Sequence, residues 1–147
     1  MLDKTDDVSI AAENWLTQFE TALATPGESA LRPLFHPESY WRDVLALSWN
    51  LQTINGPNEI LRDLKACAGC AAPHGFRIDP ARAAPRRVTR AGTSTTEAIF
   101  KFETAQCRGS GILRLIPDAA DGNRLKAWTL LTALEELKAR VESSLTT

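Results

Sequence analysis

The sequence has little of several features that mark specialised proteins. It contains three cysteines and carries a net charge of -1 in 147 residues. A chain of this length buries a core without disulfides or metal, and its charge gives no global attraction to nucleic acid. Its longest apolar runs, such as residues 127–134, are far shorter than the roughly 20 residues that cross a bilayer. These absences argue against a membrane-spanning protein and against a nucleic-acid-binding protein.

What is present is the composition of an ordinary globular domain. Hydrophobic residues make up 44% of the chain and charged residues 24%, which is typical of a folded protein. Residues 1–7 are acidic and precede an amphipathic segment, whereas a secretory signal is basic and then continuously apolar. We therefore expect one domain over residues 1–147, located in the cytoplasm.

The helical part is predicted from apolar spacing. Apolar side chains recur three and four residues apart from Val8 to Leu23, which indicates one buried helical stripe that Pro26-Gly27 ends. A shorter helix is predicted over 29–35, and another begins at Pro57 and ends at Gly69. The spacing of Leu134, Leu137 and Val141 predicts a C-terminal helix.

The second half of the chain is predicted to form strands. An aromatic-rich strand over 39–43 comes first, and further strands are expected over 76–79, 86–91, 95–104, 111–116 and 124–133. Short turns with glycine separate them, so neighbours should pair as antiparallel hairpins. Helices covering one face of such a sheet give an α+β domain. Alternation in the strand 95–104 places Thr96, Ala98, Phe100, Phe102 and Thr104 on the concave face.

Several segments together resemble the nuclear transport factor two-like (SnoaL-like) superfamily. They are Trp15 to Glu20, Leu34-Phe35, Tyr40 to Asp43, Leu47 to Trp49, Thr53 to Gly56, Phe100 to Thr104 and Ala127 to Leu134. More narrowly, they resemble the N-terminal domain of flavin-containing monooxygenase-like proteins, although this chain ends where such proteins continue into a flavin-binding part. The resemblance implies a cone-shaped α+β barrel of helices and a curved antiparallel or mixed sheet around a pocket.

The same resemblance implies partners. Domains of this kind pair through the outer face of the sheet, where Ile99, Ile112 and Arg114 would lie, so a homodimer is expected. A small apolar ligand is expected in the pocket, and a flavin-dependent monooxygenase supplied by another chain is a candidate partner.

Asp43 is the best candidate for a catalytic general base. It ends an aromatic strand whose family counterpart lines the pocket, and burial beside Trp41 would raise its pKa. Alternation puts Trp41 and Asp43 on one face of the strand and Tyr40 and Arg42 on the other. The alternative is structural: Arg42 and Asp43 make hydrogen bonds or an ion pair with the neighbouring helix.

An aromatic box is the predicted ligand site. Large rings are the usual lining of small-molecule pockets, although packing alone would also explain them. The predicted lining residues are Tyr40, Trp41, Arg42, Trp49, Phe100, Phe102, Trp128 and Thr132.

Three weaker motifs are interpreted as having no catalytic or ligand-binding role. Cys67 and Cys70, with His74 and Cys107, do not provide a dependable set of four zinc ligands, and Cys67 continues an apolar helical stripe. Gly109-Ser110-Gly111 is only a fragment of a dinucleotide-binding turn. The arginines between 77 and 90 are interpreted as a solvated face or a protected sheet edge. We therefore predict neither metal nor cofactor.

Three functions remain open from the sequence. The first is an accessory domain that binds a small molecule in its pocket. The second is a cofactor-free isomerase, cyclase, dehydratase or hydrolase that uses Asp43 as its base. The third is an interaction domain with a filled interior. A continuous cavity would favour the ligand-binding function. An inward Asp43 with a partner donor would favour the enzyme, and a filled core would favour the interaction domain.

Overall fold

The computed structural model describes residues 4–138, with side chains from residue 7 onward. The helices are α1 (Lys4–Ala24) and α2 (Pro57–Ala71), with short 3-10 turns η1 (Arg32–Leu34) and η2 (Ala119–Asp121). The strands are β1 (Phe35–Val44), β2 (Leu51–Asn55), β3 (His74–Ile78), β4 (Arg86–Arg90), β5 (Thr93–Glu103), β6 (Cys107–Asp118) and β7 (Arg124–Leu137). The predicted α+β class is confirmed.

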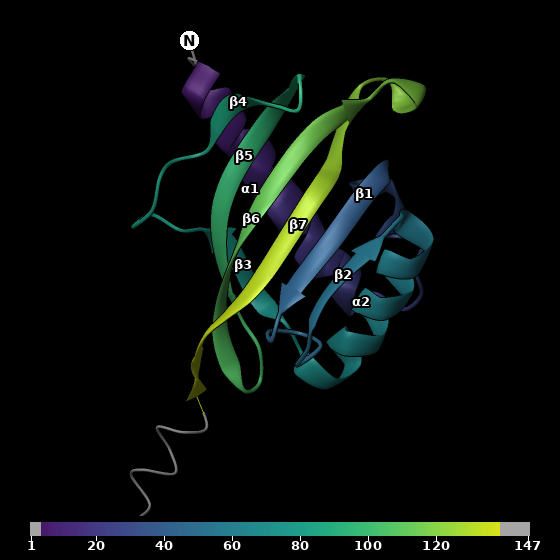
Figure 1. Ribbon diagram of the computed structural model, residues 1–147, viewed down its shortest axis with the longest axis vertical. Helices are drawn as coiled ribbons and strands as arrows, with labels where there is room; N and C mark the ends of the chain where they lie inside the picture. Colours follow the sequence, from purple (N-terminus) through teal and green to yellow (C-terminus); the bar gives the residue numbers. More distant parts are fainter. Residues whose placement is uncertain (1–3, 139–147) are drawn as a thin grey trace, which may run out of the picture.

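All seven strands belong to one curved sheet (Figure 1). Their order is β2-β1-β7-β6-β5-β3, and β4 pairs with the first half of β5. β1 runs parallel to β7, and every other pair is antiparallel. The sheet is therefore mixed, and its two longest strands, β6 and β7, lie in its middle.

The helices define the two faces of the sheet. α1 buries the predicted stripe that includes Val8, Trp15 and Phe19. In Figure 1, α1 crosses behind the sheet, and no helix of the described residues lies in front of β5, β6 and β7. We call the face toward α1 the inner face and the opposite one the outer face.

Alternation along β5 is as predicted from the sequence. Ala98, Phe100 and Phe102 are buried on the inner face, and Lys101 on the outer face is half-buried. Phe100 and Phe102 lie across from Gly111 and Gly109 of β6. Because these glycines lack a Cβ, the two rings can approach the β6 backbone closely.

Two predicted helices are wrong. Over residues 29–35 only η1 forms, and Phe35 already starts β1, because its backbone pairs with Ala127 of β7 while its ring packs against Trp15. The residues Leu134 and Leu137 belong to β7, where they lie across from Gly109 and Cys107 of β6; Val141 lies outside the described residues. In both places pairing with another strand of the sheet overrides the local spacing.

Two smaller differences concern the region around α2. The sequence did not predict β2, which pairs with β1 through Ile54 and Trp41. α2 also continues past Gly69 to Ala71, where Ala72 adopts a left-handed conformation with φ of 51°. Among the described residues, no helix is long and apolar enough to cross a membrane.

Candidate functional site

Asp43 lies on the inner face of β1 and is fully buried. Its Oδ2 accepts hydrogen bonds from the Ser48 backbone N–H at 2.8 Å and the Ser48 hydroxyl at 2.6 Å. The backbone N–H of Leu47 lies 3.2 Å from both carboxylate oxygens. Asp43 therefore holds the turn between β1 and β2 in place.

Asp43 is also joined to β7 through a buried hydrogen-bond chain. The Thr132 hydroxyl donates to Asp43 Oδ1 at 2.6 Å and accepts from the Trp41 indole N–H at 2.9 Å. All three side chains are fully buried. Buried polar groups satisfied in this way hold neighbouring strands in one register.

This arrangement favours the structural interpretation of Asp43. A general base needs free acceptor capacity toward a substrate proton, whereas both oxygens of Asp43 already accept from protein donors. Five of the best-formed hollows of the described residues lie at the surface, and none of these five is lined by Trp41, Asp43, Phe100 or Thr132. The partner donor expected for catalysis is present as Thr132, but none of these five hollows reaches it.

The predicted ligand residues do not converge on one box. Trp41, Phe100, Phe102 and Thr132 are buried on the inner face. The others are elsewhere: Tyr40 and Arg42 line a shallow hollow on the outer face, Trp49 is exposed in the β1–β2 turn, and Trp128 is half-buried at a bulge of β7. The outward direction of Tyr40 and Arg42 follows the alternation expected for β1.

The inner aromatic residues pack against one another. The Phe76 ring stacks on Phe102 with centroids 5.0 Å apart and meets Phe19 edge-on at 5.1 Å. Phe100 lies 6.0 Å from both Phe76 and Phe102. The interior between α1 and β5 is thus filled by rings. The sequence signal for this packing was the Gly109-Ser110-Gly111 segment opposite the two phenylalanines.

The three cysteines lie in different environments. Cys107 is buried and Cys70 is exposed. Burial, together with the charges of Asp43 and Asp63, raises the pKa of Cys67 to about 11, so its thiol is protonated at neutral pH and a poor nucleophile. Within the part of the chain that the structure describes, no three His, Cys, Asp or Glu side chains are grouped to hold a metal.

Three arginines converge on Glu97 at one end of the outer face. Arg114 donates at 2.8 Å, Arg90 at 3.2 Å and Arg86 at 3.3 Å. Burial alone would raise the pKa of Glu97, but the hydrogen bonds from Arg114, Arg90 and Arg86 outweigh it and lower the pKa to about 2. Part of the arginine cluster seen in the sequence therefore joins β4, β5 and β6 through one carboxylate.

The middle of the outer face carries a row of side chains across five strands. Arg42 of β1 lies beside Leu131 of β7, which lies across from Ile112 of β6, and Ile112 lies across from Ile99 of β5. The backbone N–H of Asp79, just after β3, donates to the Ile99 carbonyl. We call this set the outer row: it has three half-buried apolar side chains between a cation and a carboxylate.

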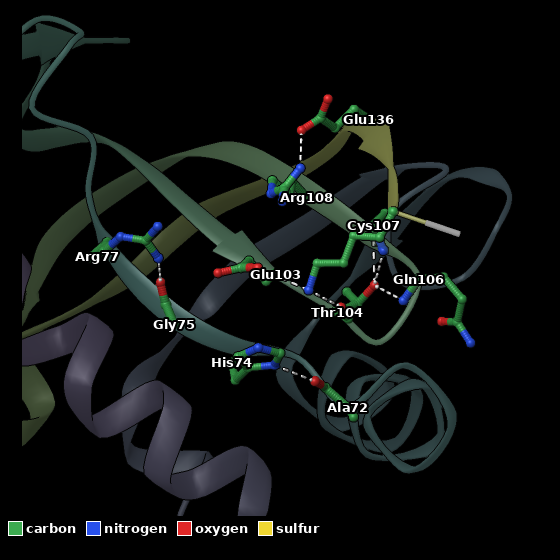
Figure 2. A network of polar contacts seen from close by, with 11 residues as sticks. Ala72, His74, Gly75, Arg77, Glu103, Thr104, Gln106, Cys107, Arg108 and Glu136 are labelled. Carbon is green, nitrogen blue, oxygen red and sulfur yellow. Dashed lines mark hydrogen bonds and ion pairs between the residues drawn. The ribbon is translucent and has the colours of Figure 1, made fainter. Parts of the chain in front are cut away.

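A groove of about 570 Å³ lies beside the outer row, toward the ends of β5 and β7. Its lining includes Arg77, Arg82, Lys101, Arg108, Ser110, Glu103, Glu135 and Glu136. Figure 2 shows Arg108 paired with Glu136, and the Arg77 side chain donating to the Gly75 carbonyl. Glu103 pairs with Lys138 at 2.9 Å. Sequence reasoning missed this groove, because its residues come from four strands that only the sheet brings together.

No protein-family model and no curated protein matches the sequence. Solved structures do. An NTF2-like superfamily protein from Salmonella enterica serovar Typhimurium LT2 is 11% identical with a TM-score of 0.62, over 90% of this chain and 94% of that one. A Nostoc punctiforme protein of unknown function with a cystatin-like fold is 11% identical with a TM-score of 0.59, and the match covers 91% of this chain and 94% of that one. Nuclear transport factor 2 from Cryptosporidium parvum is 10% identical with a TM-score of 0.54, and the match covers 90% of this chain and 95% of that one.

Proposed function

We propose that this chain, which has the nuclear transport factor 2-like fold, acts as an interaction domain that pairs with a second copy through its outer face. The observation that carries the proposal is the contrast between the two faces. The inner face is filled by aromatic rings and by a carboxylate whose hydrogen bonds are complete. The outer face has no helix over β5, β6 and β7 in the described residues, and its centre is apolar.

The outer row supports a second copy as the partner. An apolar centre with a charged rim is the usual anatomy of a protein interface. In a symmetric dimer the same surface of both copies forms the interface, so each residue must complement the residue of the second copy that it contacts. A twofold axis that runs along the strands, between two packed sheets, reverses the row and places Arg42 against Asp79 and Ile112 against itself. The row is therefore self-complementary in charge and in polarity.

The test is the mass in solution, measured by light scattering at micromolar concentration. We expect a dimer for the natural sequence and a monomer for Ile112→Glu, because a charge would be buried at the centre of the interface. Ile10→Glu is the matched control, since Ile10 is 43% exposed on α1. A mainly monomeric mass for the natural sequence would refute the proposal.

A charge exchange tests the direction of the twofold axis. Arg42→Glu or Asp79→Arg alone should weaken the dimer, because each change places like charges together. The double variant Arg42→Glu with Asp79→Arg should restore it. Two weakened single variants with no restoration would rule out this axis.

Two other functions remain predictions. Binding of a small apolar molecule would require an opening among rings that are in contact, and catalysis would require Asp43 to release one of its donors. Association with a flavin-dependent monooxygenase rests on the sequence resemblance alone. Co-purification with such an enzyme, abolished by Ile112→Glu, would extend the interaction function to that partner.

A further inference from the structure

The turn between β1 and β2 presents apolar side chains to solvent. Leu45 is 39% exposed and Trp49 is 47% exposed. Both residues have positive φ, 61° for Leu45 and 60° for Trp49, a conformation that bulky residues rarely adopt. Asp43 holds this turn through Leu47 and Ser48. Backbone strain maintained by buried hydrogen bonds often marks a functional segment.

The groove has a charged lining, in which four cations lie among the carboxylates Asp79, Glu103, Glu135 and Glu136. Arg77 and Lys101 lie directly across from each other on β3 and β5, and like charges in that position destabilise a sheet. No ion pair within residues 7–138 includes Arg77, Lys101 or Arg82. Phe102 and Gly109, which alternate with the outer residues of β5 and β6, also border the groove.

The turn and the groove lie at the same end of the sheet but toward opposite edges. Val44, the last residue of β1, lies beside Ala133 of β7, while the groove is lined by Glu135 and Glu136 just beyond it. In Figure 1, the β1–β2 turn and the β5–β6 turn both lie at the lower end, with β7 between them. A twofold axis along the strands exchanges the two edges. It therefore brings the β1 edge of each copy, where the turn begins, to the edge of the other copy that carries the groove.

We infer that Trp49 of one copy docks into the groove of the second copy, where its ring packs beside Lys101 and Arg82. The inference rests on the proposed dimer and names a contact within it. An indole face attracts Lys and Arg cations, more strongly than the other aromatic rings do. The groove volume lies within the roughly 300–1,000 Å³ of ligand pockets, which accommodates an indole. The contact would cover an exposed tryptophan and give Lys101 and Arg82 an attractive ring face.

The first experiment measures the dimer dissociation constant by sedimentation. Trp49→Ala should raise it about 30-fold or more, the range of buried tryptophan anchors. Trp49→Leu should also weaken the dimer, because it keeps an apolar side chain but removes the ring. Ile10→Ala on α1 is the control and should leave the constant unchanged.

The groove side is tested with Lys101→Ala combined with Arg82→Ala. This pair should weaken the dimer, because the ring loses its cations. Arg124→Ala is the control, since Arg124 is an exposed arginine at the opposite end of β7. A tighter dimer after removal of Lys101 and Arg82 would mean that like-charge repulsion dominates there, and would overturn the inference.

Mixing the two defective chains tests contact between copies. The Trp49→Ala chain keeps an intact groove, and the groove-defective chain keeps Trp49, so a mixed dimer regains one complete contact that neither homodimer has. Native mass spectrometry should therefore show mixed dimers above the statistical proportion. A statistical proportion, or an unchanged constant for Trp49→Ala in a protein that does dimerise, overturns the docking of Trp49 and leaves the proposed function standing. A monomeric natural sequence overturns both.

Discussion

Asp43→Asn tests whether this carboxylate is a structural residue or a base. The asparagine side chain keeps one acceptor oxygen and replaces the other with an amide donor. If its oxygen faces Ser48, its amide meets Thr132, whose hydroxyl then loses its acceptor; in the opposite orientation, the amide meets the Ser48 N–H. Either way, one or two charge-assisted hydrogen bonds worth about 1.5–3 kcal/mol each are lost.

We expect Asp43→Asn to lower the free energy of unfolding by about 3 kcal/mol, because burying a neutral amide offsets part of the loss. The whole free energy of unfolding of such a domain is only about 5–15 kcal/mol. The melting temperature should therefore fall by roughly 10 °C. Urea unfolding measures the change. Chymotrypsin should also cleave faster after Trp49, because the turn is no longer held.

Asp63→Asn is the matched control. Asp63 is half-buried on α2 and, among residues 7–138, its one ion pair is with Arg62 at 3.3 Å, so its substitution should change stability by less than about 0.5 kcal/mol. An Asp43→Asn protein as stable as the natural one, within the same margin, would refute the structural role. It would return Asp43 to consideration as a base.

Two further predictions concern other contacts of the sheet. Because the pKa of Glu97 is lowered from 4.5 to about 2, the stabilisation from its arginines is complete above pH 4.5 and is lost as the pH falls toward 2. Glu97→Gln should remove this pH-dependent stabilisation, which we expect to be about 1–2 kcal/mol after screening of the exposed arginines. Urea unfolding midpoints measured as a function of pH test this. Gly111→Ala should destabilise more than Gly109→Ala, because a Cβ at either site would meet a phenylalanine ring and a backbone carbonyl, but the Leu131 carbonyl lies much closer at Gly111 than the Ala133 carbonyl, 2.9 Å away, does at Gly109. Equal unfolding free energies would contradict this packing.

The sequence predicted those features that depend on local pattern. The stripe of α1 and the alternation of β5 needed only the positions of Trp15, Phe19, Phe100 and Phe102. The same reasoning failed for residues 29–35 and for Leu134, because β7 pairs with Phe35 and β6 pairs with the end of β7. Local spacing carries no information about such pairing.

The site was harder to predict than the fold. Alternation placed Trp41 and Asp43 inward, but nothing local showed that Leu47, Ser48 and Thr132 would fill every acceptor position of the carboxylate. Trp49 resembled a pocket residue only because it is aromatic; its exposure follows from the turn that Asp43 closes. The groove and the outer row join residues from four or five strands, so their charges could be matched only after the strand order was known.

The parallel pairing of β1 with β7 has a consequence for how the domain assembles. Trp41 lies beside Leu130 in that pair, so most of the chain separates the two strands, whereas β4 to β7 are successive hairpins. The entropy of closing a long loop is lost before its contacts form, which slows folding. We therefore expect the hairpins to form before β1 joins the sheet. The hydrogen bonds among Trp41, Thr132 and Asp43 form only once β1 has paired with β7.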